Sequence, residues 1–120
     1  MSDIKIYTYK QCGTCKKATK YLDAKGVEYN EIAIREKPPT KTELKRMLKN
    51  YEGEIKRLFN TSGQDYRNNN YKEKLPNMTK DEAIAELAAN GNLVKRPFVL
   101  IKDNQQMVGF KESEWDEVFQ

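Results

Sequence analysis

The sequence has no histidine and only two cysteines, Cys12 and Cys15, among its 120 residues. The lack of histidine excludes Ser-His-Asp triads, Cys-His catalytic pairs and zinc fingers with histidine ligands. Two cysteines are too few for the disulfide framework of a small secreted protein. A nucleophile in this chain must therefore be activated by backbone dipoles or by lysine and arginine side chains.

Long hydrophobic runs are also missing. The longest uninterrupted apolar stretch is Phe98–Ile101, far below the roughly 18 residues that a membrane-spanning helix needs. The N-terminal segment has no apolar stretch of the kind found in signal peptides. We therefore expect a cytoplasmic protein with no membrane partner. Its 120 residues, 38% of them hydrophobic and 33% charged, are typical of one soluble globular domain.

Positive charge is concentrated in the first part of the chain. Residues 1–74 carry 17 Lys and Arg against 10 Asp and Glu, whereas residues 75–120 carry 5 against 8. A basic half is compatible with nucleic acid, an acidic partner or an oxyanion substrate. These lysines alternate with acidic and polar residues and lack the interleaved aromatics of a nucleic-acid-binding stripe. Solvated helix faces are the favoured interpretation, and we expect no direct nucleic-acid binding.

The first 34 residues predict a strand, a helix and a second strand. Side chains alternate in character over 4–8, as in a short strand. From Cys15 onward apolar residues recur at intervals of three and four up to Gly26, a residue typical of helix C-termini. Residues 27–34 then predict the second strand. A βαβ unit of this length implies that its two strands are parallel.

The middle of the chain is predominantly helical. Thr40 with Glu43, and Thr79 with Glu82, fit capping boxes that begin two helices. Between them we expect a short helix over 55–59 that stops at 60–63, and a polar loop with some helix over 64–74. The second capped helix is expected to end at Asn90-Gly91.

The last part of the chain predicts two strands and a helix. The strands cover 98–101 and 106–110 and are joined by a hairpin turn at Asp103-Asn104. Ser113 is the expected cap of a final helix that carries Trp115. The whole order predicts an α/β thioredoxin-like fold with a mixed sheet, in one domain spanning 1–120 with a helical insert over about 40–92.

The motif Cys12-Gly13-Thr14-Cys15 follows the first predicted strand and opens the predicted helix. Free backbone N–H groups and the positive end of the helix dipole stabilise a thiolate there, which makes Cys12 the candidate nucleophile. Cys15 lies one turn further on, where we expect it to be less exposed and within disulfide reach. Half of a zinc site and inert structural thiols are the alternatives. Zinc would need carboxylates or a second subunit to complete its ligands.

A second candidate is the dipeptide Arg96-Pro97, just before the apolar strand. Proline cannot donate to a sheet ladder, so it is expected to begin the strand. The Arg96 guanidinium would then lie at the end of the sheet, where it can bind an oxyanion or stabilise a thiolate. The alternative is an ordinary surface salt bridge with a carboxylate.

Further motifs occur in order along the chain. They are E-x-P-P before a helix, L-F-N-T-S-G-x-x-Y-R at Leu58–Arg67, L-V-K-R-P at Leu93–Pro97 and V-G-F-K-E at Val108–Glu112. Together with the C-G-T-C motif they resemble the arsenate reductase-like family of the thioredoxin superfamily. This family includes ArsC and the redox regulator Spx, and the similarity is greatest to its short members of the YusI type. The resemblance extends over essentially the whole chain.

The resemblance implies roles for individual residues. Cys12 matches the nucleophilic cysteine of the arsenate reductases, and Arg96 matches their arginine before proline. Pro97 matches the cis-proline of thioredoxin-like folds, which predicts a cis Arg96–Pro97 bond close to Cys12. Cys15 is a second cysteine that the glutathione-dependent reductases lack and Spx has.

The oxyanion-binding set implied for this chain is Gly13, Thr14, Arg96 and Lys111. Two positions depart from the reductases, because Phe59 and Lys111 stand where those enzymes have arginines. One bidentate group is lost and another is reduced to a point charge, which predicts weaker arsenate binding.

These features favour an enzyme, a thiol–disulfide oxidoreductase in which Cys12 attacks and Cys15 resolves. The substrate would be a protein disulfide or a small oxyanion. No metal or organic cofactor is implied, and the reductant would be a thioredoxin system or a low-molecular-weight thiol. The alternatives are an arsenate reductase proper and an Spx-like transcriptional regulator, for which RNA polymerase would be the less favoured partner.

Overall fold

The computed structural model describes residues 4–102 and 105–119 of the chain. Its elements follow one another in this order: β1 (Ile4–Thr8), α1 (Gly13–Ala24), β2 (Asn30–Ala33), α2 (Lys41–Asn50), η1 (Ile55–Leu58), α3 (Gln64–Asn68), α4 (Tyr71–Lys74), η2 (Leu75–Asn77), α5 (Lys80–Ala89), η3 (Gly91–Leu93), β3 (Phe98–Ile101), β4 (Gln105–Val108) and α6 (Glu112–Val118).

The four strands form one mixed sheet in the order β2-β1-β3-β4. Strand β1 is parallel to β2 and antiparallel to β3, so that Ile6 lies between Glu31 and Val99. Strand β4 is antiparallel to β3. The predicted fold class and the parallel βαβ unit are confirmed. The predicted turn at 103–104 lies outside the described residues.

The alternation of side chains along the strands creates a hydrophobic core on each face of the sheet. On one face, Ile6 and Val99 pack with Leu22 of α1 and Trp115 of α6. On the other face, Tyr7 and Phe98 belong to a larger core that includes residues of α2, α4 and α5. The two rings of that pair meet edge to face, with their centroids 5.7 Å apart.

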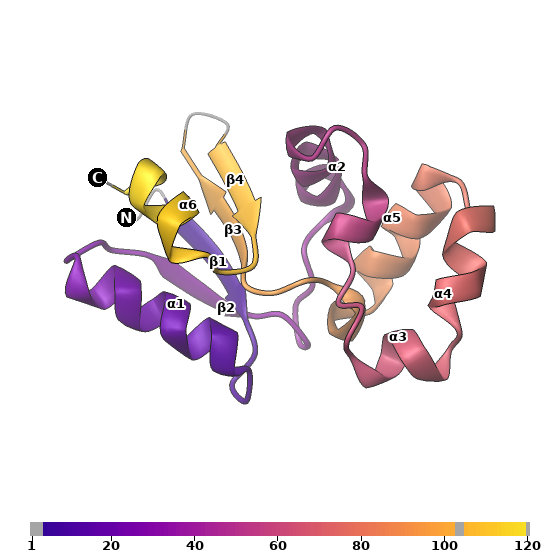
Figure 1. Ribbon diagram of the computed structural model, residues 1–120, viewed down its shortest axis with the longest axis horizontal. Helices are drawn as coiled ribbons and strands as arrows, with labels where there is room; N and C mark the ends of the chain where they lie inside the picture. Colours follow the sequence, from indigo (N-terminus) through magenta and orange to yellow (C-terminus); the bar gives the residue numbers. More distant parts are fainter. Residues whose placement is uncertain (1–3, 103–104, 120) are drawn as a thin grey trace.

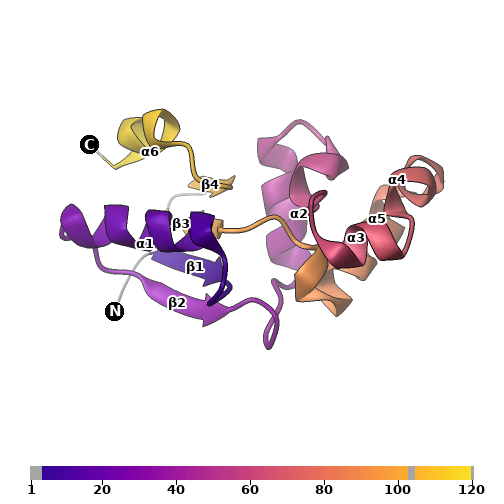
Figure 2. The ribbon, with the colours of Figure 1, turned by 60° about the horizontal axis from the view of Figure 1, so that its bottom comes forward.

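The helices between β2 and β3 lie to one side of the sheet (Figure 1). Helix α2 is next to the sheet, and α3, α4 and α5 are further away. The chain crosses to these helices after β2 and returns just before β3, and both crossings are visible in Figure 2. We call α2 to η3, residues 41–93, the helical segment. The boundary between this segment and the sheet is called the seam.

Helix α2 is attached to the sheet by polar contacts as well as by its apolar side. Arg46 donates to the side chain of Gln106 and to the carbonyl oxygen of Ile101, both at 2.6 Å. The Tyr51 hydroxyl accepts the backbone N–H of Val108 at 2.9 Å. These bonds fix α2 against the β3–β4 pair, so the first part of the helical segment has a defined position on the sheet.

Glu43 attaches α2 to β1. Its carboxylate accepts hydrogen bonds from Lys5 and from the Tyr7 hydroxyl, each at 2.7 Å, and from the backbone N–H of Thr40 at 3.0 Å. Burial alone raises the pKa of Glu43, but the bonds from Lys5, Tyr7 and Thr40 outweigh it and hold the pKa below 4.5. One capping residue therefore also joins α2 to β1.

Both predicted capping boxes are present, at the starts of α2 and α5. Gly91, predicted only as a helix terminator, has a second role. A Cβ atom at this position would come within 1.8 Å of the Ile34 carbonyl oxygen, so only glycine allows η3 to pack against the segment after β2.

One motif determines both where α1 ends and how far along the chain β2 can begin. Gly26 has a φ of +69° and closes α1 as predicted. Its N–H donates to Asp23 O at 3.1 Å, and the Val27 N–H donates to Leu22 O at 3.0 Å, which is a Schellman motif. Because this cap uses residues 25–27, the predicted strand over 27–34 is too long, and β2 covers Asn30–Ala33.

Three further predictions are corrected near the chain's middle and end. Strand β4 ends at Val108, two residues before the predicted end, because Gly109 has a φ of +75° and turns the chain away. Ser113 does not cap α6, which begins at Glu112 after Lys111 in the cap position. The segment 64–74 is mostly helical, with Asn70 in the left-handed region between α3 and α4.

None of the helices in the residues that the structure describes is long and apolar enough to cross a membrane.

Replacement of Glu43 by glutamine should lower the free energy of unfolding by about 1–3 kcal/mol at neutral pH, because bonds to a charged acceptor are lost. Since the folded-state pKa lies below 4.5, this stabilisation is present above pH 4.5 and disappears as the pH falls through the folded-state value. The difference between wild type and Glu43→Gln in urea unfolding should therefore shrink in acid.

Glu82→Gln is the matched control, because Glu82 has the same place in the capping box of α5 without partners from the sheet. A loss from Glu82→Gln as large as that from Glu43→Gln would contradict a special role for the β1–α2 attachment.

Candidate active site

The turn after β1 positions Cys12 at the start of α1. The Cys12 N–H donates to Tyr9 O at 3.0 Å, which closes the turn. Cys12 is the N-cap residue of α1, and its Sγ accepts the backbone N–H of Cys15 at 3.3 Å. A sulfur in a cap position takes the place of the usual serine or aspartate oxygen. The helix start therefore directs backbone N–H groups toward this sulfur.

The two cysteines differ in environment. Both are free thiols, Cys12 partly exposed and Cys15 only 2% exposed. The pKa of the Cys15 thiol is raised from 9.0 to about 12, first by burial and then by its hydrogen bond with the Cys12 side chain. A bond with the Tyr9 backbone and the charge of Arg96 act in the opposite direction. Cys15 is thus a protonated thiol at neutral pH, as its predicted burial implied.

Cys12 opens onto a cleft of about 480 Å³ at the seam. One wall comes from the turns after β1 and β4, and the other from the residues after η1. The lining consists of Tyr9, Gln11, Cys12, Thr14, Asn60, Ser62, Gly63, Lys95, Arg96, Gly109 and Phe110. Its two charged residues are both cations, which suits an anionic ligand.

Arg96 lies in this cleft and has a distinctive environment. Its guanidinium carbon is 5.0 Å from the centroid of the Tyr9 ring. Its Nη1 atom is buried and has no hydrogen-bond partner among the described residues. No carboxylate of the described residues forms an ion pair with it, so the surface salt bridge considered as an alternative is not found. The Arg96–Pro97 peptide bond is cis, which confirms that prediction.

The structure brings some predicted site residues together and separates others. Cys12, Thr14 and Arg96 all line the cleft, and Cys15 lies behind Cys12. Gly13 and the buried Pro97 adjoin lining residues in sequence but are not part of the lining. Lys111 is exposed at the start of α6 and also lies outside the lining.

Phe59, one of the two positions that depart from the reductases, is buried. Its side chain is 1% exposed and packs against Tyr66 and Tyr71, with ring centroids 6.1 and 5.8 Å away. A charged residue could not occupy this position without losing its hydration. The side chain that the resemblance aligns with an arginine of the arsenate reductases is thus part of the hydrophobic core.

Several lining residues were not identified from the sequence, notably Tyr9, Asn60, Ser62 and Lys95. They meet because the segment after η1 pairs with the segment before Pro97. Asn60 N donates to Leu93 O at 2.7 Å, and Lys95 N donates to Leu58 O at 2.8 Å. This pairing, residues 58–60 with 93–95, is called the hinge bridge below. The motif at Leu58–Arg67 contained Asn60 and Ser62, and the motif at Leu93–Pro97 contained Lys95, but the sequence indicated only a helix end at 60–63.

The zinc alternative requires a cluster of ligands. Over residues 4–102 and 105–119, no three Cys, Asp or Glu side chains lie close enough together to hold a metal ion. Cys12 and Cys15 would therefore need ligands from elsewhere to complete such a site.

The sequence is also similar to those of known proteins. The model of the ArsC family matches residues 7–118. YusI of Bacillus subtilis is 48% identical over 113 residues, which cover 93% of this chain and 94% of YusI. The global transcriptional regulator Spx of Listeria innocua is 24% identical over 111 residues, or 92% of this chain and 82% of Spx.

The same relationship is seen in three dimensions. The crystal structure of an ArsC family related protein from Bacteroides fragilis superposes with a TM-score of 0.90 at 40% sequence identity, covering 97% of each chain. A family match over nearly the whole sequence, together with the shared thioredoxin-like fold, makes this protein a member of the ArsC family.

Proposed function

We propose that the protein is a cytoplasmic thiol–disulfide oxidoreductase in which Cys12 is the attacking thiolate and Cys15 the resolving thiol. The observation that carries the proposal is the asymmetry of the two sulfurs. Cys12 is partly exposed on a cationic cleft and accepts the Cys15 N–H at 3.3 Å, whereas Cys15 is buried with its pKa raised to about 12. The accessible sulfur of Cys12 attacks the substrate, and the buried sulfur of Cys15 beside it reacts in the second step.

The reaction follows from this arrangement. The Cys12 thiolate attacks one sulfur of a substrate disulfide, forms a mixed disulfide and releases the first substrate thiolate, which takes up a proton from water. Cys15 then loses its proton and attacks Cys12 Sγ. The Cys12–Cys15 disulfide forms, and the second substrate thiolate leaves. Two electrons pass from the protein to the substrate, and an external thiol or a thioredoxin system returns them.

Arg96 is proposed to bind negative charge next to Cys12. Its buried Nη1 has no hydrogen-bond partner within residues 4–102 and 105–119, and its stacking on Tyr9 limits the directions in which the guanidinium can point. A leaving thiolate or an oxyanion would supply the missing acceptor. The Gly13 and Thr14 backbone at the start of α1 is proposed to contribute N–H groups to the same anion. Lys111 is proposed to act only at long range, because it lies outside the lining.

Arsenate reduction is a second candidate function, favoured by the family match over 7–118 and by Cys12 and Arg96 in one cleft. The burial of Phe59 and the exposed position of Lys111 leave Arg96 and Lys95 as the cations of the cleft. We therefore propose that arsenate binds weakly and is a poor substrate. An Spx-like function would require a stable complex with RNA polymerase, which a pulldown with purified polymerase tests directly.

The order of alkylation is a first test of the assigned roles. Because burial raises the pKa of Cys15 to about 12, this thiol stays protonated at pH 8. Iodoacetamide should therefore modify Cys12 and leave Cys15 unmodified in the folded, reduced protein. Peptide mapping by mass spectrometry gives the two rates separately. Faster modification of Cys15 than of Cys12 would reverse the proposed roles.

Trapping experiments test whether Cys12 reacts with disulfides. Cys15→Ser should accumulate a mixed disulfide with a model substrate, because the resolving step is removed, whereas Cys12→Ser should form none. Arg96→Gln in the Cys15→Ser background should slow trapping about tenfold to a hundredfold, the loss expected for one charge-assisted hydrogen bond of about 1.5–3 kcal/mol.

Arg96→Lys is the informative control, because it restores the charge without the planar group and should recover only part of the rate. Unchanged trapping in Arg96→Gln would remove Arg96 from the site. Equal trapping by Cys12→Ser and Cys15→Ser would contradict the oxidoreductase proposal itself.

A further inference from the structure

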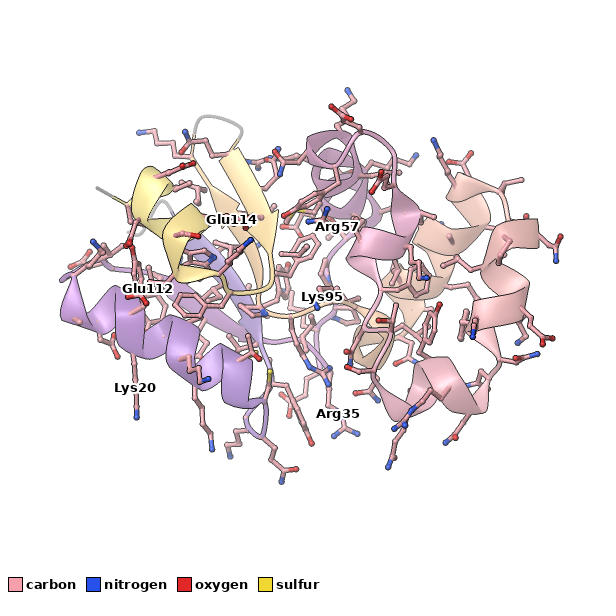
Figure 3. The ribbon with its side chains drawn as sticks, viewed as in Figure 1. Lys20, Arg35, Arg57, Lys95, Glu112 and Glu114 are labelled. Carbon is pink, nitrogen blue, oxygen red and sulfur yellow. The ribbon has the colours of Figure 1, made fainter. Side chains whose placement is uncertain are left out.

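The cleft at Cys12 shares lining residues with two further hollows along the seam. A hollow of about 240 Å³, which includes Arg35, shares Arg96 and Tyr9 with the cleft. On the other side, a hollow of about 300 Å³, which includes Arg57, shares Lys95 with it. Figure 3 shows Arg35, Lys95 and Arg57 one after another along the seam. The hollows therefore form one continuous surface track, with Cys12 near its centre.

The charge of this track is predominantly positive. Its five cations are called the cationic track: Arg35, Arg96, Lys95, Lys56 and Arg57. The two carboxylates among the lining residues are Glu54 and Asp65, and Asp65 already accepts a hydrogen bond from Asn90 at 2.9 Å. Within 4–102 and 105–119, no carboxylate forms an ion pair with any of the five cations.

The arginines of the track are held in position by aromatic rings. The guanidinium carbon of Arg35 is 4.8 Å from the centroid of Tyr9, and that of Arg57 is 4.5 Å from the centroid of Tyr51. Arg35 also donates to the Tyr9 hydroxyl at 2.7 Å. Stacked arginines keep the N–H groups at their edges available for carboxylates. Cations spaced in this way on both sides of Cys12 suit a ligand with several negative charges.

We propose that the cationic track binds an acidic polypeptide segment that carries the substrate disulfide, with the disulfide at Cys12 and acidic side chains at the Arg35 and Arg57 ends. This inference rests on the proposed function, because the occupant must present sulfur to Cys12. A small oxyanion would fill only the middle of the track and leave both ends unused.

A nucleic acid is the other polyanion to consider, and the track is poorly suited to it. Single-stranded nucleic acids bind largely by stacking bases on exposed aromatic rings. Here the Tyr9 and Tyr51 rings are already stacked with arginines. A nucleic acid also offers no disulfide for the thiol pair at the centre of the track to reduce, whereas a polypeptide can carry one.

The test compares disulfide peptides of equal length whose cystine is flanked by glutamate or by glutamine. The readout is the ratio of their reduction rates by the reduced wild-type protein in single-turnover experiments, because damage to Cys12 itself lowers both rates. We expect a ratio of about ten at low salt, falling toward one in about 0.5 M salt as the charges are screened. A ratio near one at low salt would overturn the inference.

Variants show which residues produce the preference for the acidic peptide. In the double variant Arg35→Gln, Arg57→Gln, the ratio of the two reduction rates should fall most of the way to one. Lys20→Gln should keep it, because Figure 3 places Lys20 on α1 away from the seam, and it removes the same type of charge. Because Lys20→Gln removes one charge and the double variant two, a loss in Lys20→Gln of half or more of that in the double variant would mean that net charge, and not the track, produces the preference.

Two further probes separate other occupants. The rate with oxidised glutathione should be the same in the double variant as in the wild type. A loss equal to that seen with the acidic peptide would mean that the occupant is a small anionic disulfide and not a polypeptide. Tighter binding of a single-stranded oligonucleotide than of an acidic peptide with the same charge would also overturn the inference.

The proposed function itself is measured with dithiodipyridine, an uncharged disulfide. Reaction of this reagent at Cys12 without any preference for the acidic peptide would overturn only the inference. Failure of the reduced wild-type protein to react with it would contradict the proposed function as well.

Discussion

The hinge bridge is the contact on which the rest of the site depends. Two backbone hydrogen bonds, of 2.7 and 2.8 Å, join residues 58–60 to residues 93–95, and Phe59 pairs with Val94 between them. These bonds hold the end of η1 next to the segment that leads into the cis Arg96–Pro97 bond. One wall of the cleft comes from the turns that follow β1 and β4, and the other from the residues after η1, which this bridge holds beside Lys95 and Arg96.

The chemistry of the site results from the different burial of two sulfurs, those of Cys12 and Cys15, in the same helical turn. Cys12 has the N-cap position and faces the cleft, whereas Cys15 points into the core that contains Ala18 and Leu22. Burial raises the pKa of Cys15 to about 12 and keeps it from reacting before Cys12.

Much of this structure was predictable because the decisive signals are local. Thr40 and Glu43 lie within one turn, so their capping box is visible in the sequence, and so is the helix start at Cys12. The contacts of Glu43 with Lys5 and Tyr7 were not predictable, because they join residues 38 and 36 positions apart.

The missed lining residues have the same explanation. Asn60 and Lys95 reach the cleft only through the hinge bridge, whose hydrogen bonds are not encoded by any nearby pattern. The family resemblance indicated both Arg96 and Lys111, but Arg96 lines the cleft, whereas Lys111 is exposed just before α6 and lies outside the lining. The predicted end of β4 was two residues too late because Gly109, with its φ of +75°, turns the chain away after Val108.

The central claim is that Cys12 and Cys15 are a two-electron redox pair within one chain. The most direct test equilibrates the wild-type protein with dithiol–disulfide buffers set at potentials between about −320 and −120 mV and determines its mass after acid quenching. The account predicts one transition from the dithiol to a monomer lighter by two hydrogens, with Cys12 and Cys15 joined in the oxidised form. Oxidation that gives only disulfide-linked dimers, or mixed disulfides with the buffer thiol and no intramolecular bond, would contradict it.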